Sequence, residues 1–384
     1  MKTGGKNLWN WVIVSVSGVI GFLFVSIFFV NTIFLQNAFV ILDLSQRVPF
    51  SVKNEVLVEK PEKVYAKGLY LTAYSAASKK KRESIIALIE NTELNTVVID
   101  IKDDSGYVLY DSNILEVDEA GLEDNRLGDV AGIIKEFHDR GIYVIARQMV
   151  FQDPALAKKR PQWAIRNTQG GLWKDHKGQA WVDPTKKEVW EYNMAIAKEA
   201  VTFGFDEVNF DYVRFPSDGD MRSVVYTNKD KKKHEVMEEF YRYLGESFVN
   251  IPAWVSIDMF GFVMERHDGM VIGQRLADAV DVVDYICPMM YPSHYPRGHL
   301  GLRNPAAHPG EVIRHGMEKG VSHFAQTKAA VRPWIQAFNI GAMYGEKNIR
   351  AQIDEIERFG GAGWLLWNAA NRYSSAGLKM NPQT

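Results

Sequence analysis

Three aspartates interrupt apolar, β-branched stretches of this 384-residue sequence, where a carboxylate is costly to bury without a partner. They are Asp100, Asp211 and Asp258. Two carboxylates that face each other across a cleft can cleave a glycosidic bond, because one protonates the leaving oxygen while the other attacks or activates water. We therefore predict that Asp211 and Asp258 form a catalytic pair. A structural ion pair is the alternative for each of the three aspartates.

The neighbours of Asp211 and Asp258 predict different roles for them. Arg214 follows Asp211 closely, and a nearby cation favours the ionised carboxylate that a nucleophile or base requires. Asp258 lies between Trp254 and Phe260, and an apolar setting favours the protonated form of a carboxyl group. Asp258 is accordingly the predicted acid.

Other polar and aromatic side chains near the same positions are predicted to bind substrate. Alternate residues of a strand share a face, so Asp100 and Lys102 should both point inward, as should Asn209 and Asp211. The pairs Asp100–Lys102 and Asp211–Arg214 could equally be structural. The predicted substrate-binding residues are Asp100, Lys102, Arg147, Trp181, Asn209, Arg214, Tyr291, Gln336, Trp367 and Asn368.

Eight β-rich apolar runs alternate with helix-like stretches in the sequence that surrounds these residues. The runs are 68–74, 96–102, 142–150, 207–213, 253–259, 285–291, 333–338 and 363–367. The helix-like stretches include 80–90, 130–140, 186–203, 235–248, 270–282 and 346–359. This alternation predicts a parallel sheet with helical crossovers, and eight units over about 300 residues fit a single (β/α)8 TIM barrel. No glycine-rich turn follows the first run, which disfavours an open nucleotide-binding sheet.

The predicted barrel occupies residues 67–375, with a linker at 43–66 and a C-terminal tail at 376–384. In a TIM barrel the loops that follow the strands converge on one face, and the active site lies there. The three aspartates are close to the ends of the second, fourth and fifth runs. The fold would therefore bring them together.

The N-terminal 42 residues form a predicted cytoplasmic stub and transmembrane anchor. No charged residue occurs from Leu8 to Leu42, and the 20 residues from Trp11 to Val30 are long enough as a helix to cross the apolar core of a bilayer, about 30 Å. Lys2 and Lys6 precede the segment, so the positive-inside rule keeps the N-terminus in the cytoplasm and exports the barrel. A cleaved signal peptide is the alternative.

Composition argues against several other classes of protein. The 45 basic and 47 acidic residues nearly cancel, which gives no basic field for nucleic acid. The nine histidines include no H-x-H or H-E-x-x-H motif, so we expect no metal, and no sequence motif indicates a cofactor. The single cysteine, Cys287, lies in an apolar run and reads as a buried, inert thiol. All but two of the charged residues follow Leu42, and that part is mildly acidic, which favours a neutral or weakly charged ligand.

The sequence resembles a known bacterial family. The stretch 205–219, FDEVNFDYVRFPSDG, carries the most specific element, D-Y-V-R-F-P, and further matches lie at 181–184, 284–292 and 363–368. Together these residues are similar to the bacterial putative glycoside hydrolase domain family, which is related to amylase-like and chitinase-like TIM barrels. The resemblance covers about 67–373 and implies a (β/α)8 fold and hydrolysis of glycosidic bonds. Many related barrels place a glutamate acid at a strand end, where this sequence offers Asp258.

The sequence therefore predicts a membrane-anchored glycosidase that acts on an extracytoplasmic or cell-envelope polysaccharide. Its predicted partners are that glycan and, through the N-terminal helix, the lipid bilayer. A non-catalytic carbohydrate- or cell-wall-binding barrel is the main alternative, because it would also need the aromatic residues. The sequence does not favour a metal-dependent deacetylase, since closely spaced histidines are missing.

Overall fold

A computed structural model describes residues 59–381 of the chain. The predicted anchor and most of the predicted linker lie outside the described residues, so they remain predictions. Within 59–381, no helix has the length and apolar character needed to cross a membrane.

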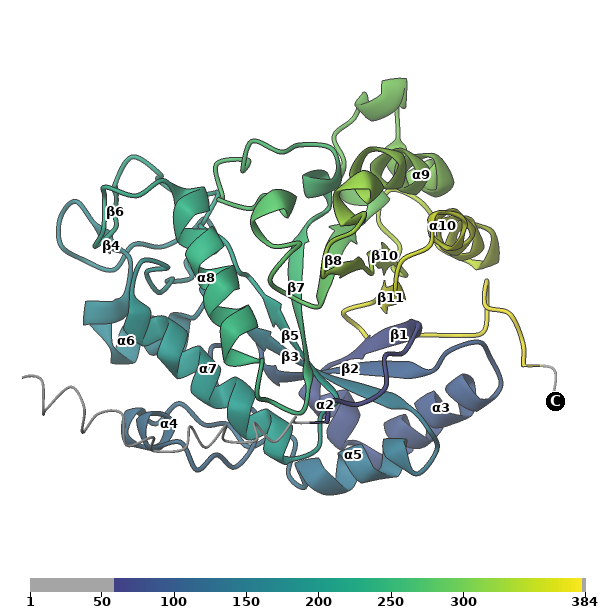
Figure 1. Ribbon diagram of the computed structural model, residues 1–384, viewed down its shortest axis with the longest axis horizontal. Coiled ribbons are helices and arrows are strands. Elements are labelled where there is room, and N and C mark those ends of the chain that lie inside the picture. Colours follow the sequence, from purple (N-terminus) through teal and green to yellow (C-terminus); the bar gives the residue numbers. More distant parts are fainter. Residues whose placement is uncertain (1–58, 382–384) are drawn as a thin grey trace, which may run out of the picture. The chain divides into compact units, whose positions relative to one another are not determined.

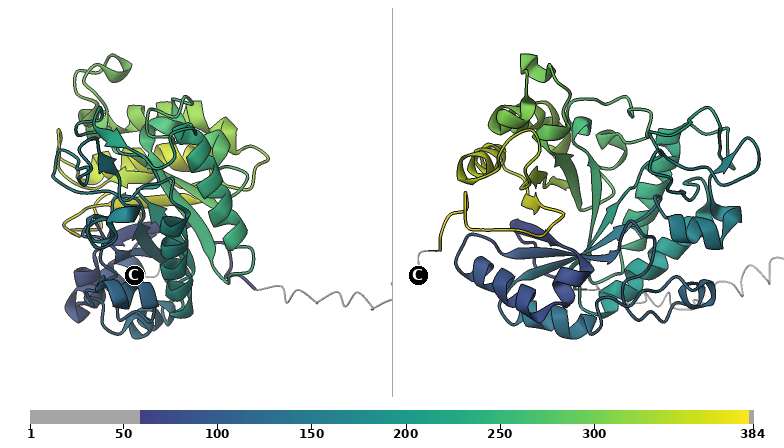
Figure 2. Two further views of the ribbon diagram at one scale, coloured as in Figure 1. Left: turned by 90° about the vertical axis from the view of Figure 1, so that its left-hand side faces the viewer. Right: turned by 180° about the vertical axis from the view of Figure 1, so that it is seen from behind.

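Eight parallel strand positions form a closed barrel, as the alternating sequence pattern predicts (Figure 1). In barrel order these are β1 (Ala66–Leu71), β2 (Thr96–Lys102), β3 (Tyr143–Met149), β5 (Glu207–Asp211), β7 (Trp254–Phe260), β8 (Tyr285–Met290), the pair β9 (Ala330–Val331) and β10 (Trp334–Gln336), and β11 (Gly363–Trp367). β11 pairs with β1, which closes the barrel, and the right-hand view of Figure 2 draws the yellow C-terminal part beside the purple first strand. Every predicted run overlaps one of these strands.

The seventh strand position consists of two short strands in one register. Tyr285 of β8 pairs with Ala330 of β9, and Met289 of β8 pairs with Trp334 of β10, so the offset between the partners is the same. Pro333 lies between β9 and β10 and has no N–H to give to the ladder. The interruption is therefore local, and the strand keeps its direction.

Helices connect most of the strands. The longer ones are α3 (Lys79–Glu90), α5 (Val130–His138), α7 (Lys187–Thr202), α8 (Lys233–Ser247), α9 (Pro309–Gly320) and α10 (Glu346–Phe359). The short ones are α2 (Ala73–Ala77), α4 (Leu115–Ala120) and α6 (Pro154–Lys159), and β4 (Arg166–Asn167) pairs with β6 (Val224–Val225) in a small antiparallel ribbon beside the barrel. Helix α9 was not predicted, although Pro309 at its first turn is a favourable helix start.

The predicted helix at 270–282 is wrong. The connection between β7 and β8 contains only 3-10 turns, at Gly261–Met264 and Leu276–Asp278. Gly269 and Gly273 have φ values of +83° and +88°, and Met270 and Val271 between them also have positive φ. A right-handed helix cannot continue through left-handed residues, so this segment runs as an irregular loop.

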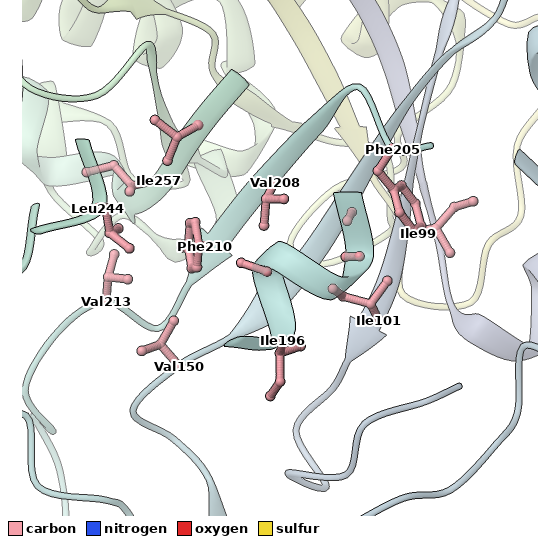
Figure 3. Packing of buried hydrophobic residues seen from close by; sticks show 14 of the residues in the cluster. Ile99, Ile101, Val150, Ile196, Phe205, Val208, Phe210, Val213, Leu244 and Ile257 are labelled. Carbon is pink, nitrogen blue, oxygen red and sulfur yellow. The ribbon is translucent and has the colours of Figure 1, made fainter. Parts of the chain in front are cut away.

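The main hydrophobic core lies between the outer face of the barrel and its helices (Figure 3). Val208 and Phe210 of β5 point outward into this layer, as the period of two predicts, and Ile196 of α7 and Leu244 of α8 belong to the same cluster. A smaller cluster fills the barrel interior and includes Cys287, where burial raises the pKa of the thiol. The outer layer fixes the strands, and the inward-facing residues between the apolar ones remain available for polar contacts.

A β-bulge separates two residues that the sequence places on one face. Asp100 pairs in register with Arg147, but Lys102 pairs with Gln148, the next residue of β3. The extra residue in β2 reverses the alternation, so Asp100 points into the barrel while Lys102 points outward. Lys102 Nζ lies 2.6 Å from Asp153 Oδ2 and donates to the carbonyl of Met149 at 2.8 Å. The predictions that Lys102 binds substrate or pairs with Asp100 are therefore wrong.

Removal of Lys102 should destabilise the barrel without altering its pocket. Both side chains of the Lys102–Asp153 pair have zero exposure, so Lys102→Met leaves an acid buried without its cation, which costs about 3–5 kcal/mol. The free energy of unfolding from urea titrations measures this loss. Lys135→Met, which breaks the exposed Lys135–Asp139 pair, is the matched control and should cost less than about 1 kcal/mol. Equal losses in the two variants would contradict this interpretation.

Candidate active site

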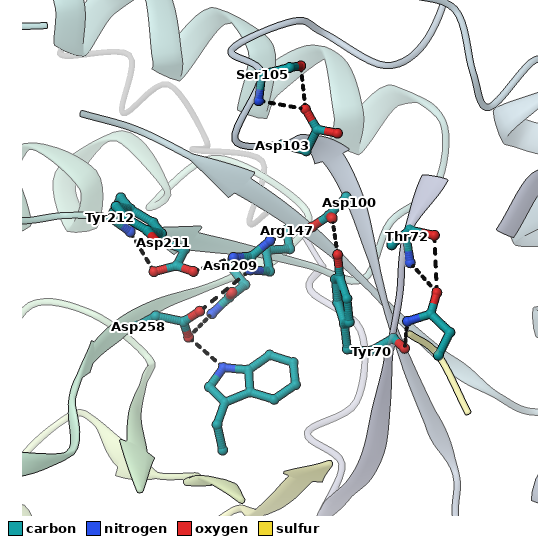
Figure 4. A network of polar contacts seen from close by, with 12 residues as sticks. Tyr70, Thr72, Asp100, Asp103, Ser105, Arg147, Asn209, Asp211, Tyr212 and Asp258 are labelled. Atoms are coloured by element: carbon teal, nitrogen blue, oxygen red, sulfur yellow. Dashed lines mark hydrogen bonds and ion pairs between the residues drawn. The ribbon is translucent and has the colours of Figure 1, made fainter. Parts of the chain in front are cut away.

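The polar side chains of the barrel interior meet at the carboxyl ends of β2, β3, β5 and β7 (Figure 4). A cavity of about 400 Å³ opens there, within the size range of small-ligand sites. Its lining combines two carboxylates and two guanidinium groups with a largely aromatic wall. The lining residues are Arg147, Asp211, Tyr212, Arg214, Asp258, Phe260, Gly261, Phe262, Gln274, Met289, Tyr291, His294, Tyr295 and Trp367.

Arg147 of β3 binds the acids of the neighbouring strands. Its guanidinium donates to Asp100 Oδ1 at 2.6 Å and to Asp211 Oδ2, and its Nε lies 3.9 Å from Asp258 Oδ2. Burial alone would lower the pKa of Arg147, but the charges of Asp100 and Asp211 raise it well above its usual value. Asp211 is thus paired with Arg147, and the predicted partner Arg214 makes no ion pair with it among the described residues.

Asp100 binds the guanidinium nitrogen of Arg147 that does not bind Asp211. It accepts a hydrogen bond from the Tyr70 hydroxyl as well as from Arg147. Burial raises the pKa of Asp100 to about 6, and the opposing charge of Arg147 limits the rise. Asp100 lies behind the cavity wall and holds Arg147 in place.

Asp258 of β7 has a different environment from Asp211. Only 1% of the residue is exposed, and its Oδ1 accepts hydrogen bonds from Asn209 Nδ2 at 2.9 Å and Trp334 Nε1 at 2.8 Å. Within the described part of the chain, Oδ2 has no hydrogen-bond donor. Burial, together with the charge of Asp211, raises the pKa of Asp258 well above its ordinary value. This carboxyl group is suited to carry a proton.

The chain turns sharply directly after Asp211. Tyr212 has a φ of +54°, an uncommon conformation for a bulky residue, and its backbone N–H donates to Asp211 Oδ1 at 2.5 Å. Asp211 therefore has one oxygen bound by Arg147 and the other by the backbone N–H of Tyr212. Strained backbone of this kind concentrates at functional sites, where the surrounding structure must stabilise it.

The structure brings six of the ten predicted substrate-binding residues to the site. Arg147, Arg214, Tyr291 and Trp367 line the cavity, while Asp100 and Asn209 bond to its lining residues from behind. The other four, Lys102, Trp181, Gln336 and Asn368, do not line it. Trp181 is buried beneath Tyr212, at 5.8 Å between ring centroids.

Gln336 and Asn368 lie outside the cavity lining, and their amides bond to loop backbone. Gln336 accepts from the N–H of Ser293 at 3.0 Å and donates to Phe338 O at 2.9 Å. Asn368 donates to Ala337 O at 2.7 Å. Both residues fix the loops that bound the cavity.

Several lining residues were not predicted. Phe260, Phe262 and Met289 are apolar residues that the sequence does not distinguish from core residues, and Gln274 falls in the segment wrongly predicted as a helix. Gln274 donates to the carbonyl of Asp258 at 3.2 Å and accepts from Phe260 N–H at 2.9 Å, so it ties this loop to the end of β7. The sequence signal for Gln274 would have been a polar residue directly after a glycine in the connection between β7 and β8. Within residues 59–381, no cluster of three or more His, Cys, Asp or Glu is arranged to hold a metal ion.

Comparisons with solved structures agree with this fold. The glycoside hydrolase domain of PgaB (BpsB) from Bordetella bronchiseptica aligns over 79% of this chain and 94% of its own, with a TM-score of 0.55 and 11% identity. An α-galactosidase from Thermus thermophilus aligns over 81% of this chain and 59% of its own, with a TM-score of 0.50 and 11% identity. At this identity the likeness concerns the fold.

A structure from Ruminiclostridium thermocellum, described as a hypothetical protein, is 41% identical. It covers 50% of this chain and 96% of its own length, with a TM-score of 0.46. A search of curated proteins found no match. The family model for a putative glycosyl hydrolase domain matches residues 68–373, close to the whole described barrel. The chain therefore belongs to the putative glycosyl hydrolase domain family.

Proposed function

We propose that the barrel cleaves glycosidic bonds with Asp258 as the acid and Asp211 as the nucleophile or base. The observation that carries this proposal is the contrast between two carboxyl groups that line one cavity. Asp211 is ion-paired with Arg147, which stabilises its carboxylate form. Asp258 is buried, its Oδ2 lacks a donor within the described residues, and its pKa is raised. Such a contrast separates the acid from the base in glycosidases.

In the proposed reaction, Asp258 Oδ2 gives its proton to the glycosidic oxygen as the bond to the anomeric carbon breaks. Asp211 either attacks the anomeric carbon, with water releasing the sugar in a second step, or removes a proton from the attacking water. The products in both cases are two sugars with one added water molecule. Arg147 restrains Asp211 throughout, because its other N–H group is held by Asp100.

The aromatic wall supports a carbohydrate ligand. Trp367 stacks on Tyr70 at 4.1 Å between ring centroids and faces Tyr291 at 6.5 Å. Arg147 lies 5.0 Å from the Trp367 ring, so this residue borders both the ion-pair centre and the cavity. Sugar rings present apolar C–H faces that stack on such rings, while their hydroxyl groups find polar partners nearby. We infer that Trp367 and Tyr291 hold the sugar next to the carboxylates.

We further propose that residues 8–42 anchor the protein in a membrane and that the barrel acts outside the cytoplasm on an envelope or external polysaccharide. The support is the uncharged, apolar sequence from Leu8 to Leu42 with Lys2 and Lys6 before it. The substrate would then be a glycan of the cell surface or its surroundings.

Substitution of either carboxyl group should impair hydrolysis, in ways that distinguish the two roles. With an envelope oligosaccharide, Asp258→Asn should lower kcat by about 100- to 10,000-fold, the usual contribution of general acid catalysis. With an aryl glycoside whose phenol leaves without protonation, Asp258→Asn should lose much less activity, whereas Asp211→Asn should be inactive on both. Release of reducing sugar and of phenol measures the two reactions.

The matched control is Asp139→Asn, an aspartate at the exposed end of α5 that pairs with Lys135. Its activity should equal that of the unsubstituted protein. Full glycan cleavage by both Asp211→Asn and Asp258→Asn would refute the proposed reaction and favour a barrel that binds carbohydrate without cleaving it.

The alkaline limb of the pH profile should report the proton on Asp258. The acid is active only while protonated, so kcat/KM falls as the pH rises through the pKa of Asp258. The Trp334 indole N–H stabilises the carboxylate form at 2.8 Å and so lowers that pKa. Trp334→Phe should therefore move the alkaline limb to higher pH. Trp190→Phe removes a buried indole donor from α7 and should leave the limb in place; a shift to lower pH in Trp334→Phe would exclude Asp258 as the acid.

Membrane attachment should depend on the N-terminal segment. The full chain is expected in the membrane fraction and to resist extraction with alkaline carbonate, because about 20 apolar residues hold it in the bilayer. A variant that begins at Asp43 should be released. Recovery of the full chain in the carbonate supernatant would show that residues 8–42 do not anchor it.

A further inference from the structure

Arg214 is the second arginine of the cavity and follows Asp211 by three residues. Its position is fixed by the turn at Tyr212 and by Phe215, whose N–H donates to Ile272 O at 2.9 Å. The guanidinium lies 4.9 Å from the Trp181 ring, 5.0 Å from that of Tyr212 and 4.9 Å from that of Phe260. Three aromatic rings therefore orient its flat fork of N–H donors.

Arg214 is buried but lacks the acid that buried arginines elsewhere in this barrel have. Only 9% of the residue is exposed, and one N–H donates to the carbonyl of Phe215 at 3.0 Å. Arg147 binds Asp100 and Asp211, and Arg332 binds Glu207, whereas no carboxylate of residues 59–381 lies within ion-pair distance of Arg214. A buried charge without a partner is costly unless a ligand supplies one.

The acids nearest to Arg214 have other partners. Burial is the largest effect on Arg214 and lowers its pKa. The charges of Asp211, Asp218 and Asp175, which lie beyond ion-pair distance, raise the pKa by less. Asp175 accepts the indole N–H of Trp181 at 3.1 Å, and Asp218 accepts the backbone N–H of His176 at 3.2 Å. Arginine nevertheless keeps its proton, so a fixed cation lines the same cavity as Asp211.

We propose that Arg214 binds the carboxylate of an acidic sugar, so that the substrate is a glycan containing uronic acid or another carboxyl-bearing residue. This inference rests on the proposed glycosidase function and adds the substrate class. The planar fork of arginine matches a carboxylate with two parallel hydrogen bonds, which gives selectivity over a neutral hydroxymethyl group. Asp211 would repel the carboxylate of a ligand bound next to it. Arg214, whose charge no protein carboxylate compensates, offsets this repulsion.

Matched ligands test the proposal. Oligosaccharides that contain glucuronate or galacturonate are compared with the same molecules after chemical reduction of the carboxyl groups, which changes charge but not linkage. Binding is measured by calorimetry with the Asp258→Asn variant, which prevents cleavage, and hydrolysis with the unsubstituted enzyme. At least one acidic member should bind about 10-fold more tightly than its reduced form, the scale of one charge-assisted hydrogen bond.

Variants at Arg214 then show whether this residue is responsible. In the Asp258→Asn background, Arg214→Gln should lose the preference by weakening the acidic ligand while the reduced ligand binds as before. Arg214→Lys should keep part of the preference, because it retains the charge but not the fork. Arg222→Gln removes an exposed arginine, 96% accessible, from the same β5–α8 connection and should change neither ligand. Thermal unfolding of each variant confirms that it folds.

The inference is overturned if no acidic member binds better than its reduced form, or if Arg214→Gln weakens both forms equally. Its failure is distinguishable from failure of the proposed function. Cleavage of neutral and acidic glycans at equal kcat/KM would support the proposed glycosidase function and refute the proposed preference for an acidic substrate. Selective binding of acidic ligands without any hydrolysis by the unsubstituted protein would support the role of Arg214 and contradict the glycosidase.

Discussion

The site depends on one guanidinium group that compensates the acids of two neighbouring strands. Arg147 bridges Asp100 and Asp211, and its Nε faces Asp258 at 3.9 Å. Without this cation, the repulsion between buried carboxylates would drive them to protonate or to separate. Because Arg147 binds Asp211 but makes no hydrogen bond to Asp258 within the described residues, it also makes the two carboxyl groups chemically different. The surrounding strands form the scaffold that fixes the position of the Arg147 guanidinium.

The scaffold includes a polar line through the barrel interior. Glu207, Asn209 and Asp211 are alternate residues of β5, and all three point inward. Glu207 binds Arg332 and accepts a hydrogen bond from Ser256, whose hydroxyl in turn accepts the Asn209 amide N–H at 3.0 Å. The same amide donates to Asp258, so the line ends at the proposed acid. Asn209 Oδ1 and Arg332 Nε remain without a hydrogen-bond partner within the described residues. The links that do form favour one arrangement of the strands, since each broken link would leave a further buried polar group unpaired.

The barrel and the two central aspartates could be predicted from the sequence because both leave a local pattern in it. Buried parallel strands leave continuous apolar runs, and acids inside such runs stand out. The sequence could not predict contacts that depend on neighbouring strands: the partner of Asp211 is Arg147 across the β3–β5 ladder, not Arg214 in the same segment. Lys102 was misplaced because a single extra residue in β2 reverses the alternation without a sequence signal. The helix predicted at 270–282 failed because left-handed backbone, not apolar periodicity, decides the path there.

The two arginines of the cavity also explain how the proposed acidic ligand is compatible with a mildly acidic chain. Average charge governs long-range attraction, whereas recognition within the cavity depends on which charges the protein leaves uncompensated. Arg147 has its acids supplied by the barrel and cannot serve a ligand without giving them up. Arg214 is held by aromatic rings and one backbone carbonyl, contacts that orient it and leave its charge free. A single carboxylate on an otherwise uncharged stretch of glycan therefore suits this site better than a densely charged polymer, which the overall negative charge would repel.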